Sequence, residues 1–145
     1  MDTYTHSHNG IDYTITVKEN WSGTESIEFD DFNRIEANTA TLQAYLLSLQ
    51  YEIAVLSTVT NRTQAYIDFL AGINRIEGNL ETIRLNFATP PGYLPAKTWV
   101  LRKGFDNTDA NRLEKDIRLL FQMAYEVYQS FRYCGTFYAG EEGLL

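Results

Sequence analysis

One four-residue pattern occurs three times in this chain, and it constrains the fold more than any other feature. The pattern is asparagine, arginine, an aliphatic residue and glutamate, and its copies occupy residues 33–36, 74–77 and 111–114. Each copy is followed at fixed offsets by a carboxamide or carboxylate and then by an aliphatic residue: Asn38 and Leu42, Asn79 and Ile83, Asp116 and Leu120. Recurrence at intervals of about 40 residues is typical of a repeated supersecondary unit. The repeat therefore argues against a chain built around one catalytic pocket.

The composition is that of a globular domain with an acidic charge balance. Of the 145 residues, 44% are hydrophobic and 21% are charged, which indicates one folded domain over residues 1–145 and not a disordered chain. The formal net charge is −7 at pH 7. Nucleic acids and anionic lipids require a basic face, so we expect neither as a partner. The single cysteine, Cys134, excludes an internal disulfide and a cysteine-based metal cage.

The beginning of the chain does not resemble a targeting segment. It lacks the basic region and the apolar run of a signal peptide. The chain also lacks any apolar run of about 18 residues, the length that a membrane helix needs. We therefore expect a soluble protein made in the cytoplasm, without membrane insertion.

The N-terminal arm, residues 1–19, has the pattern of a β-hairpin. Residues 4–8 and 11–17 flank Asn9-Gly10, a pair that suits a type I′ turn because both residues tolerate positive φ. Apolar and polar side chains alternate along the second strand. An isolated hairpin is marginal in water, so we expect this one to lie on a neighbouring element or on another chain.

Two long helices are predicted over residues 30–88. Apolar residues alternate by three and four along a first helix from Asp31 to Ser57, and this seam consists of Phe32, Ile35, Thr39, Leu42, Leu46, Leu49, Ile53 and Leu56. Asp30 or Asp31 is the expected N-cap. The same spacing continues through Tyr66, Phe69, Ile73, Ile76, Leu80, Ile83 and Phe87. Because only residues 58–61 break the pattern, the two helices are predicted to form an antiparallel hairpin, with Gly72 marking a kink or a separate start.

A third helix is predicted after a long connection. Thr89-Pro90-Pro91-Gly92 ends the second helix and opens a loop over residues 89–107. The third helix covers 108–134, with Thr108 or Asp109 as its N-cap, and residues 135–145 contain too many glycines for a helix. The predicted fold is mainly α: a three-helix bundle with coiled-coil-like heptad seams, a short N-terminal β-hairpin and an irregular C-terminal docking tail.

Core packing explains the aliphatic residue of the repeated pattern but not its polar residues. One explanation is duplication with solvated charge pairs on each helix. A second is a polar network in which each arginine forks onto a glutamate or a carbonyl of an adjoining helix or subunit. A chemical role is the least favoured, since no histidine ligand and no Glu-x-x-His sequence lies near the glutamates. The candidate assembly residues in the repeats are Arg34, Glu36, Arg75, Glu77, Arg112 and Glu114.

Aromatic residues crowd the end of the third helix and the tail, at Tyr125, Tyr128, Phe131, Tyr133, Phe137 and Tyr138. They either cap the open end of the bundle or form a protein–protein contact, in which tyrosine and phenylalanine are enriched. We predict a contact, because a glycine-rich tail cannot bury them by itself.

Sequence motifs for catalysis are absent. The chain has no Gly-x-Ser-x-Gly and no glycine-rich phosphate loop. His6 and His8 could share one face of a strand, but no third metal ligand is within reach in the sequence, so surface histidines are expected. We predict no catalytic site, no metal site and no cofactor.

Two segments and the chain ending resemble tail proteins of phages and prophages of Gram-positive bacteria. The residues that carry the resemblance are Trp21-Ser22-Gly23 followed by 29–36, the similar stretch from Trp99 through 105–114, and 133–144. The resemblance implies a non-enzymatic structural subunit of a tail, baseplate or fibre attachment. It further implies a location in the virion tail, other tail proteins as partners, and a trimer or hexamer.

We therefore expect a structural subunit that links other virion proteins through oligomeric assembly, with the hairpin and the tail as docking elements. A small helical adaptor or regulatory protein that binds one protein partner is the alternative.

Overall fold

The N-terminal hairpin forms as predicted. In the computed structural model, which describes residues 1–54, 56–65 and 69–134 (side chains to residue 131), β1 (Asp2–His8) pairs antiparallel with β2 (Ile11–Val17). Asn9 and Gly10 connect the strands with φ of 52° and 80°. Two successive positive φ values define a type I′ turn, whose twist matches that of the strands.

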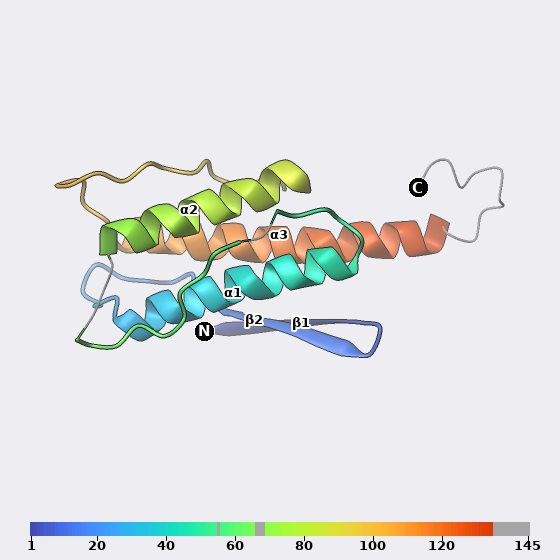
Figure 1. Ribbon diagram of the computed structural model, residues 1–145, viewed down its shortest axis with the longest axis horizontal. Helices are drawn as coiled ribbons and strands as arrows, with labels where there is room; N and C mark the ends of the chain where they lie inside the picture. Colours follow the sequence, from blue (N-terminus) through green and yellow to red (C-terminus); the bar gives the residue numbers. More distant parts are fainter. Residues whose placement is uncertain (55, 66–68, 135–145) are drawn as a thin grey trace.

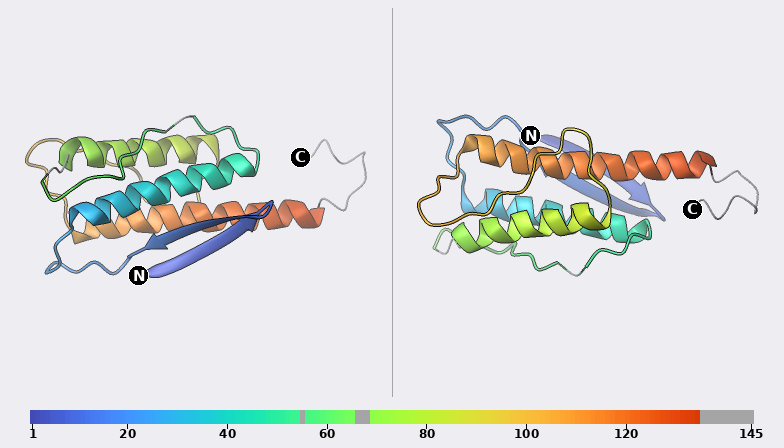
Figure 2. Two further views of the ribbon diagram at one scale, coloured as in Figure 1. Left: turned by 60° about the horizontal axis from the view of Figure 1, so that its bottom comes forward. Right: turned by 90° about the horizontal axis from the view of Figure 1, so that it is seen from above.

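The described residues form three helices, so the mainly α prediction is confirmed. They are α1 (Phe29–Ser48), α2 (Phe69–Asn86) and α3 (Asn107–Cys134). Figure 1 shows all three running in the same direction, from left to right, with the connections returning along the outside of the bundle. Figure 2 shows that the helices do not lie in one plane, and each contacts the other two.

The predicted antiparallel helical hairpin over 30–88 is wrong, because the first helix ends early. Gln50 has a φ of 75°, and the N–H groups of Gln50 and Tyr51 donate to the carbonyls of Leu47 and Leu46 at 3.0 and 3.1 Å. These bonds form a Schellman motif, which terminates a helix. The chain then runs back beside the bundle and starts α2 at the same end as α1 (Figure 1). The predicted start of that helix at Tyr66 lies outside the described residues.

The apolar spacing continued past the end of α1 because the returning chain also packs on the core. Ile53 is buried, and Leu49 and Leu56 are partly buried, although none of them is helical. A stretch that touches the bundle from outside needs apolar residues at intervals too. In this segment the intervals matched a helical seam by packing and not by helical geometry.

Both predicted N-caps lie a few residues too far along the chain. α1 starts at Phe29, and Asp31 instead accepts from the N–H of the N-cap residue Glu28 at 2.9 Å. At α3 the cap is Asp106, whose Oδ1 accepts from the N–H groups of Thr108 and Asp109 at 3.0 and 3.2 Å. Asp109 reciprocates by accepting from the Asp106 N–H, so the carboxylate expected as cap completes a capping box.

The core lies between the helices and under the hairpin. The aliphatic residue of every repeat, Ile35, Ile76 and Leu113, is 0% exposed. Ile15 and Val17 of β2 close the core from one side, where β2 contacts α1 and α3. The hairpin thus lies on the bundle of its own chain. None of the helices in the described parts of the chain has the length and apolar character needed to cross a membrane.

We predict that Leu113→Ala lowers the free energy of unfolding by about 2–5 kcal/mol, because it leaves a cavity at a fully buried position. Urea denaturation measures the change. Leu85→Ala is the control, since Leu85 is 69% exposed on α2 and its loss should change stability by less than about 0.5 kcal/mol. Equal effects of the two substitutions would contradict the described core.

Candidate functional site

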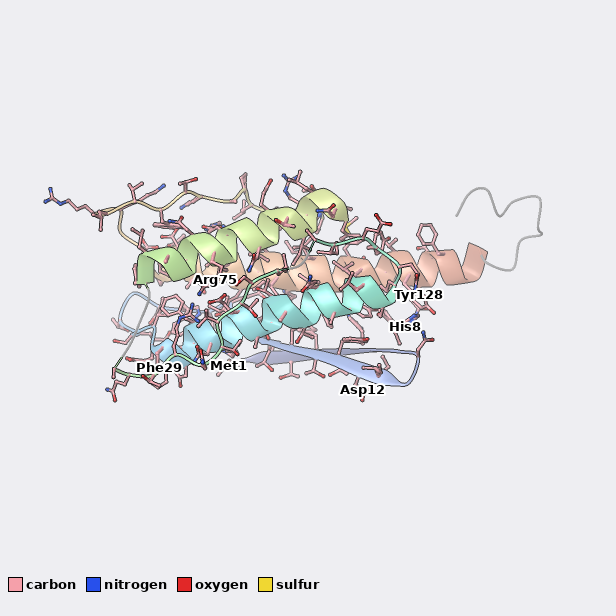
Figure 3. The ribbon with its side chains drawn as sticks, in the orientation of Figure 1. Met1, His8, Asp12, Phe29, Arg75 and Tyr128 are labelled. Atoms are coloured by element: carbon pink, nitrogen blue, oxygen red, sulfur yellow. The ribbon has the colours of Figure 1, made fainter. Side chains whose placement is uncertain are left out.

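The three repeated patterns meet in a closed ring of ion pairs. Each arginine forks onto both oxygens of a glutamate in another helix: Arg34 of α1 onto Glu114 of α3, Arg75 of α2 onto Glu36 of α1, and Arg112 of α3 onto Glu77 of α2. In the second pair the N–O distances are 2.8 and 2.7 Å. Figure 3 shows Arg75 on α2, from which its side chain reaches α1. Every helix supplies one arginine and one glutamate, so the ring links all three.

The glutamates of this ring are buried. Glu36 and Glu114 are 0% exposed and Glu77 is 3% exposed. A buried carboxylate is stable only when it is paired and hydrogen-bonded. Burial by itself opposes the Arg34 cation, but Glu114, with a smaller contribution from Asp31, more than offsets that effect, and the pKa of Arg34 is raised. The carboxylate therefore favours the charged form of the Arg34 guanidinium.

A further side chain donates to each glutamate from the segment that approaches the helices. Trp21 Nε1 donates to Glu114 at 2.6 Å, and Trp99 Nε1 donates to Glu77 at 2.8 Å. In the remaining repeat Arg62 takes the same place and donates to Glu36 through Nη2. Backbone N–H groups of Lys18 and Val59 also donate to Glu114 and Glu36, at 2.8 and 3.2 Å.

The asparagine that opens each pattern holds the backbone of the same approaching residue. Its Oδ1 accepts from that residue's N–H, and its Nδ2 donates to that residue's carbonyl. The pairs are Asn33 with Arg62 (3.0 and 3.0 Å), Asn74 with Trp99 (2.8 and 2.8 Å), and Asn111 with Trp21 (2.7 and 3.1 Å). In this way each asparagine offers an extended chain the donor and acceptor that a neighbouring strand would supply.

A second clamp lies farther along each helix. The carboxamide or carboxylate after each pattern binds the backbone of a residue separated from it by 22 positions: Asn38 binds Thr16, Asn79 binds Ser57, and Asp116 binds Leu94. We call the stretches between the two clamps, residues 16–21, 57–62 and 94–99, the approach segments. The helix that follows an approach segment in the chain binds the start of that segment, and a different helix binds its end.

The clamps close into a cycle with approximate threefold symmetry. Helix α1 holds the end of the second approach segment, α2 holds the end of the third, and α3 holds the end of the first. The repeats depart from symmetry at two polar positions. Arg62 stands where the others have tryptophan, and Asp116 stands where the others have asparagine.

Of the explanations left open by the sequence, the structure supports the polar network. The six arginines and glutamates predicted as assembly residues contact other helices of the same chain, and the glutamates are in the interior. Within the described ranges, no group of three or more histidine, cysteine, aspartate or glutamate side chains is arranged to hold a metal ion. What the ring can do chemically is neutralise buried charge and fix the register between helices.

The predicted aromatic residues lie away from the ring, near the C-terminal end of α3. Phe131 is 47% exposed, and Tyr128 contacts His8 of β1 edge to face at 4.9 Å between ring centroids (Figure 3). Tyr133 belongs to the last turn of α3, whereas Phe137 and Tyr138 lie outside the described residues.

The histidines expected on the surface are partly buried. The His6 ring stacks on Tyr125 and Phe121 at 4.2 and 4.6 Å, and its Nε2 bonds to Gln122 at 2.5 Å. Burial lowers the pKa of His6, and the bond to Gln122 only partly opposes that effect. His6 therefore anchors the hairpin on α3.

Sequence reasoning missed the approach segments as partners of the ring. One signal was available, since Trp21 and Trp99 stand at the same spacing before their patterns, as does Arg62. Thr16, Ser57 and Leu94 gave no signal, because the clamps bind their backbones and their side chains differ.

No protein-family model, curated protein or solved structure matches this chain.

We predict that Glu114→Ala lowers the free energy of unfolding by about 3 kcal/mol, because it removes the carboxylate that binds both Nη groups of the partly buried Arg34 and leaves the Trp21 indole and Lys18 backbone N–H groups without their acceptor. This is the low end of the usual range, since Arg34 keeps 17% of its side chain exposed and can be hydrated. Urea denaturation measures the loss. Glu126→Ala on the exposed face of α3 is the matched control and should change stability by less than about 0.5 kcal/mol.

The symmetry of the ring also predicts the outcome of replacing its odd member. Arg62→Trp should be more stable than Arg62→Ala by at least about 1 kcal/mol, because an indole N–H can donate to Glu36 as Trp99 does to Glu77. Denaturation of the two variants under identical conditions gives the difference. A tryptophan variant no more stable than the alanine variant would show that the three positions are not equivalent.

Proposed function

We propose that the protein is a non-enzymatic structural subunit of a phage or prophage-derived tail or baseplate, which links other virion proteins through oligomeric assembly. The observation that carries the assembly part of this proposal is the projecting end of α3. This helix has 28 residues, against 20 in α1 and 18 in α2, and Figure 1 shows its C-terminal turns extending beyond both.

Apolar side chains gather on that projecting end. A hollow of about 240 Å³ lies on one side of it, lined by Leu49, Gln50, Tyr51, Tyr128 and Phe131. A larger hollow of about 600 Å³ lies along another side of α3, and its lining combines apolar residues such as Met123 and Val127 with polar ones such as Gln122 and Glu126. Aromatic and methionine side chains are enriched in protein–protein interfaces and are seldom left in such groups on monomers.

The class of assembly rests on the sequence resemblance to tail proteins of Gram-positive phages and prophages. Its first two segments end in the repeated pattern, and its tryptophans are the residues that the asparagines of α2 and α3 hold. A bundle whose three helices are linked by ion pairs, with exposed apolar side chains at one end, suits a subunit that joins neighbouring proteins. We infer other tail or baseplate proteins as partners, a homo-oligomer of three or six copies, and a place in the virion tail.

Light scattering of the purified chain tests this proposal. We expect a mass several times that of one chain. We also expect Phe131→Glu to lower this mass, because assembly would then have to bury the glutamate charge in place of an exposed aromatic ring. Leu85→Glu is the control, because Leu85 is also exposed, at 69% against 47% for Phe131, but lies on α2.

A chain that remains monomeric at all concentrations would contradict the homo-oligomer. If that monomer bound a single protein partner through the Phe131 surface, the result would favour the alternative of a small helical adaptor. Circular dichroism of both variants establishes that the fold is unchanged.

A further inference from the structure

The second clamp differs between the repeats in one chemical respect. In the first two repeats a carboxamide donates to a backbone carbonyl, from Asn38 Nδ2 to Thr16 O at 2.6 Å and from Asn79 Nδ2 to Ser57 O at 2.9 Å. In the third repeat the position is Asp116. Its Oδ1 accepts from the Leu94 N–H at 3.0 Å, but Oδ2 is buried and has no hydrogen-bond partner among the residues that the structure describes. An ionised carboxylate has no proton with which to complete the clamp.

We propose that Asp116 works as a protonated substitute for asparagine, and that the third clamp is complete only when Oδ2 carries a proton. The proton comes from water, and the resulting O–H group donates to the carbonyl of Leu94, as the amide groups donate in the other two repeats. Loss of the proton returns it to water and leaves the third approach segment, residues 94–99, held at its start by one bond. The third clamp is therefore sensitive to protonation, whereas the carboxamide clamps of Asn38 and Asn79 carry no titrating group.

The surroundings of Asp116 favour the neutral acid. Asp116 is 1% exposed, and burial is the largest effect that raises its pKa, to about 7, with Glu77 of α2 adding to it. The Leu94 N–H and the cations of Arg112 and Lys115 act in the opposite direction but do not outweigh burial.

The nearest cation is already committed. Arg112 Nη1 lies 3.7 Å from Asp116 Oδ2, which is too far for a hydrogen bond, and both Nη groups of Arg112 bind Glu77. Tyr93, in the connection between α2 and α3, also interacts electrostatically with this carboxyl group. Its pKa is raised by burial and then by Asp116, with smaller effects from Glu81 and Arg84 of α2. Tyr93 therefore remains neutral where Asp116 titrates.

The direction of the pH dependence follows from the two states. An aspartate in an unfolded chain has a pKa of about 3.9. Between pH about 4 and 7 the folded chain thus holds a proton that the unfolded chain has released. The stabilisation from this group is complete below pH about 4 and is lost as the pH rises through about 7.

The test compares the wild-type chain with Asp116→Asn by denaturation from pH 4 to 8. The asparagine variant has a permanent donor, so the ratio of the two unfolding constants should change by up to about tenfold per pH unit and should favour the variant most at pH 8. Titrations common to both proteins cancel in this ratio. A ratio that is independent of pH, or a variant less stable than the wild type at pH 8, would overturn the proposal.

The reverse substitution is the matched control. Asn38→Asp places a carboxylate in the buried first clamp, where Asn38 is 5% exposed, and should introduce the same pH dependence relative to the wild type. The titration of the Asp116 carboxyl carbon in the wild-type chain, followed by NMR, does not depend on any variant folding. We expect a midpoint near neutral pH, and a midpoint below pH 5 would refute the protonated clamp.

Discussion

Three carboxylates in the interior of a small helical bundle must be neutralised where they lie, and the architecture follows from that requirement. Glu36, Glu77 and Glu114 are withdrawn from water, and an unpaired charge there would cost more than most single interactions in the fold contribute. Each is neutralised by an arginine from another helix. The arginine and the glutamate of one pattern are two positions apart and do not face each other on their helix, so the ring closes only when the three helices lie side by side with their patterns at the same height.

Parallel helices impose a second requirement, because the chain must return along the bundle between them. In the second and third repeats the returning backbone contains no β-strand within the described residues. Its N–H and carbonyl groups still need partners where they are shielded from water. Asn33, Asn74 and Asn111 supply both donor and acceptor to this backbone, and the arginine that follows each of them binds a glutamate of another helix. One short pattern therefore meets both the charge requirement and the backbone requirement.

The asymmetric parts of the molecule lie outside this common frame. The hairpin covers one side of the bundle, α3 extends past its neighbours, and Arg62 and Asp116 replace the residues that symmetry would supply. Three equivalent repeats would present the same surface on all three sides of the bundle, so these departures make its sides different. The proposed docking surface and the proposed proton-sensitive clamp both belong to such departures, whereas the common frame supplies rigidity.

The sequence determined the N-terminal hairpin and which side of each helix faces the core. Asn9-Gly10 fixed the hairpin, and the three-and-four spacing placed Ile35, Ile76 and Leu113 inward, since both signals act between residues close in the chain. The sequence did not predict that the helices are parallel, because Leu49, Ile53 and Leu56 pack on the core with helical spacing although they lie after the end of α1. Only the tertiary structure decided what the repeated polar residues bind. Some of their partners are backbone groups, which every residue has, and the others are side chains whose distance in the chain says nothing of their distance in space.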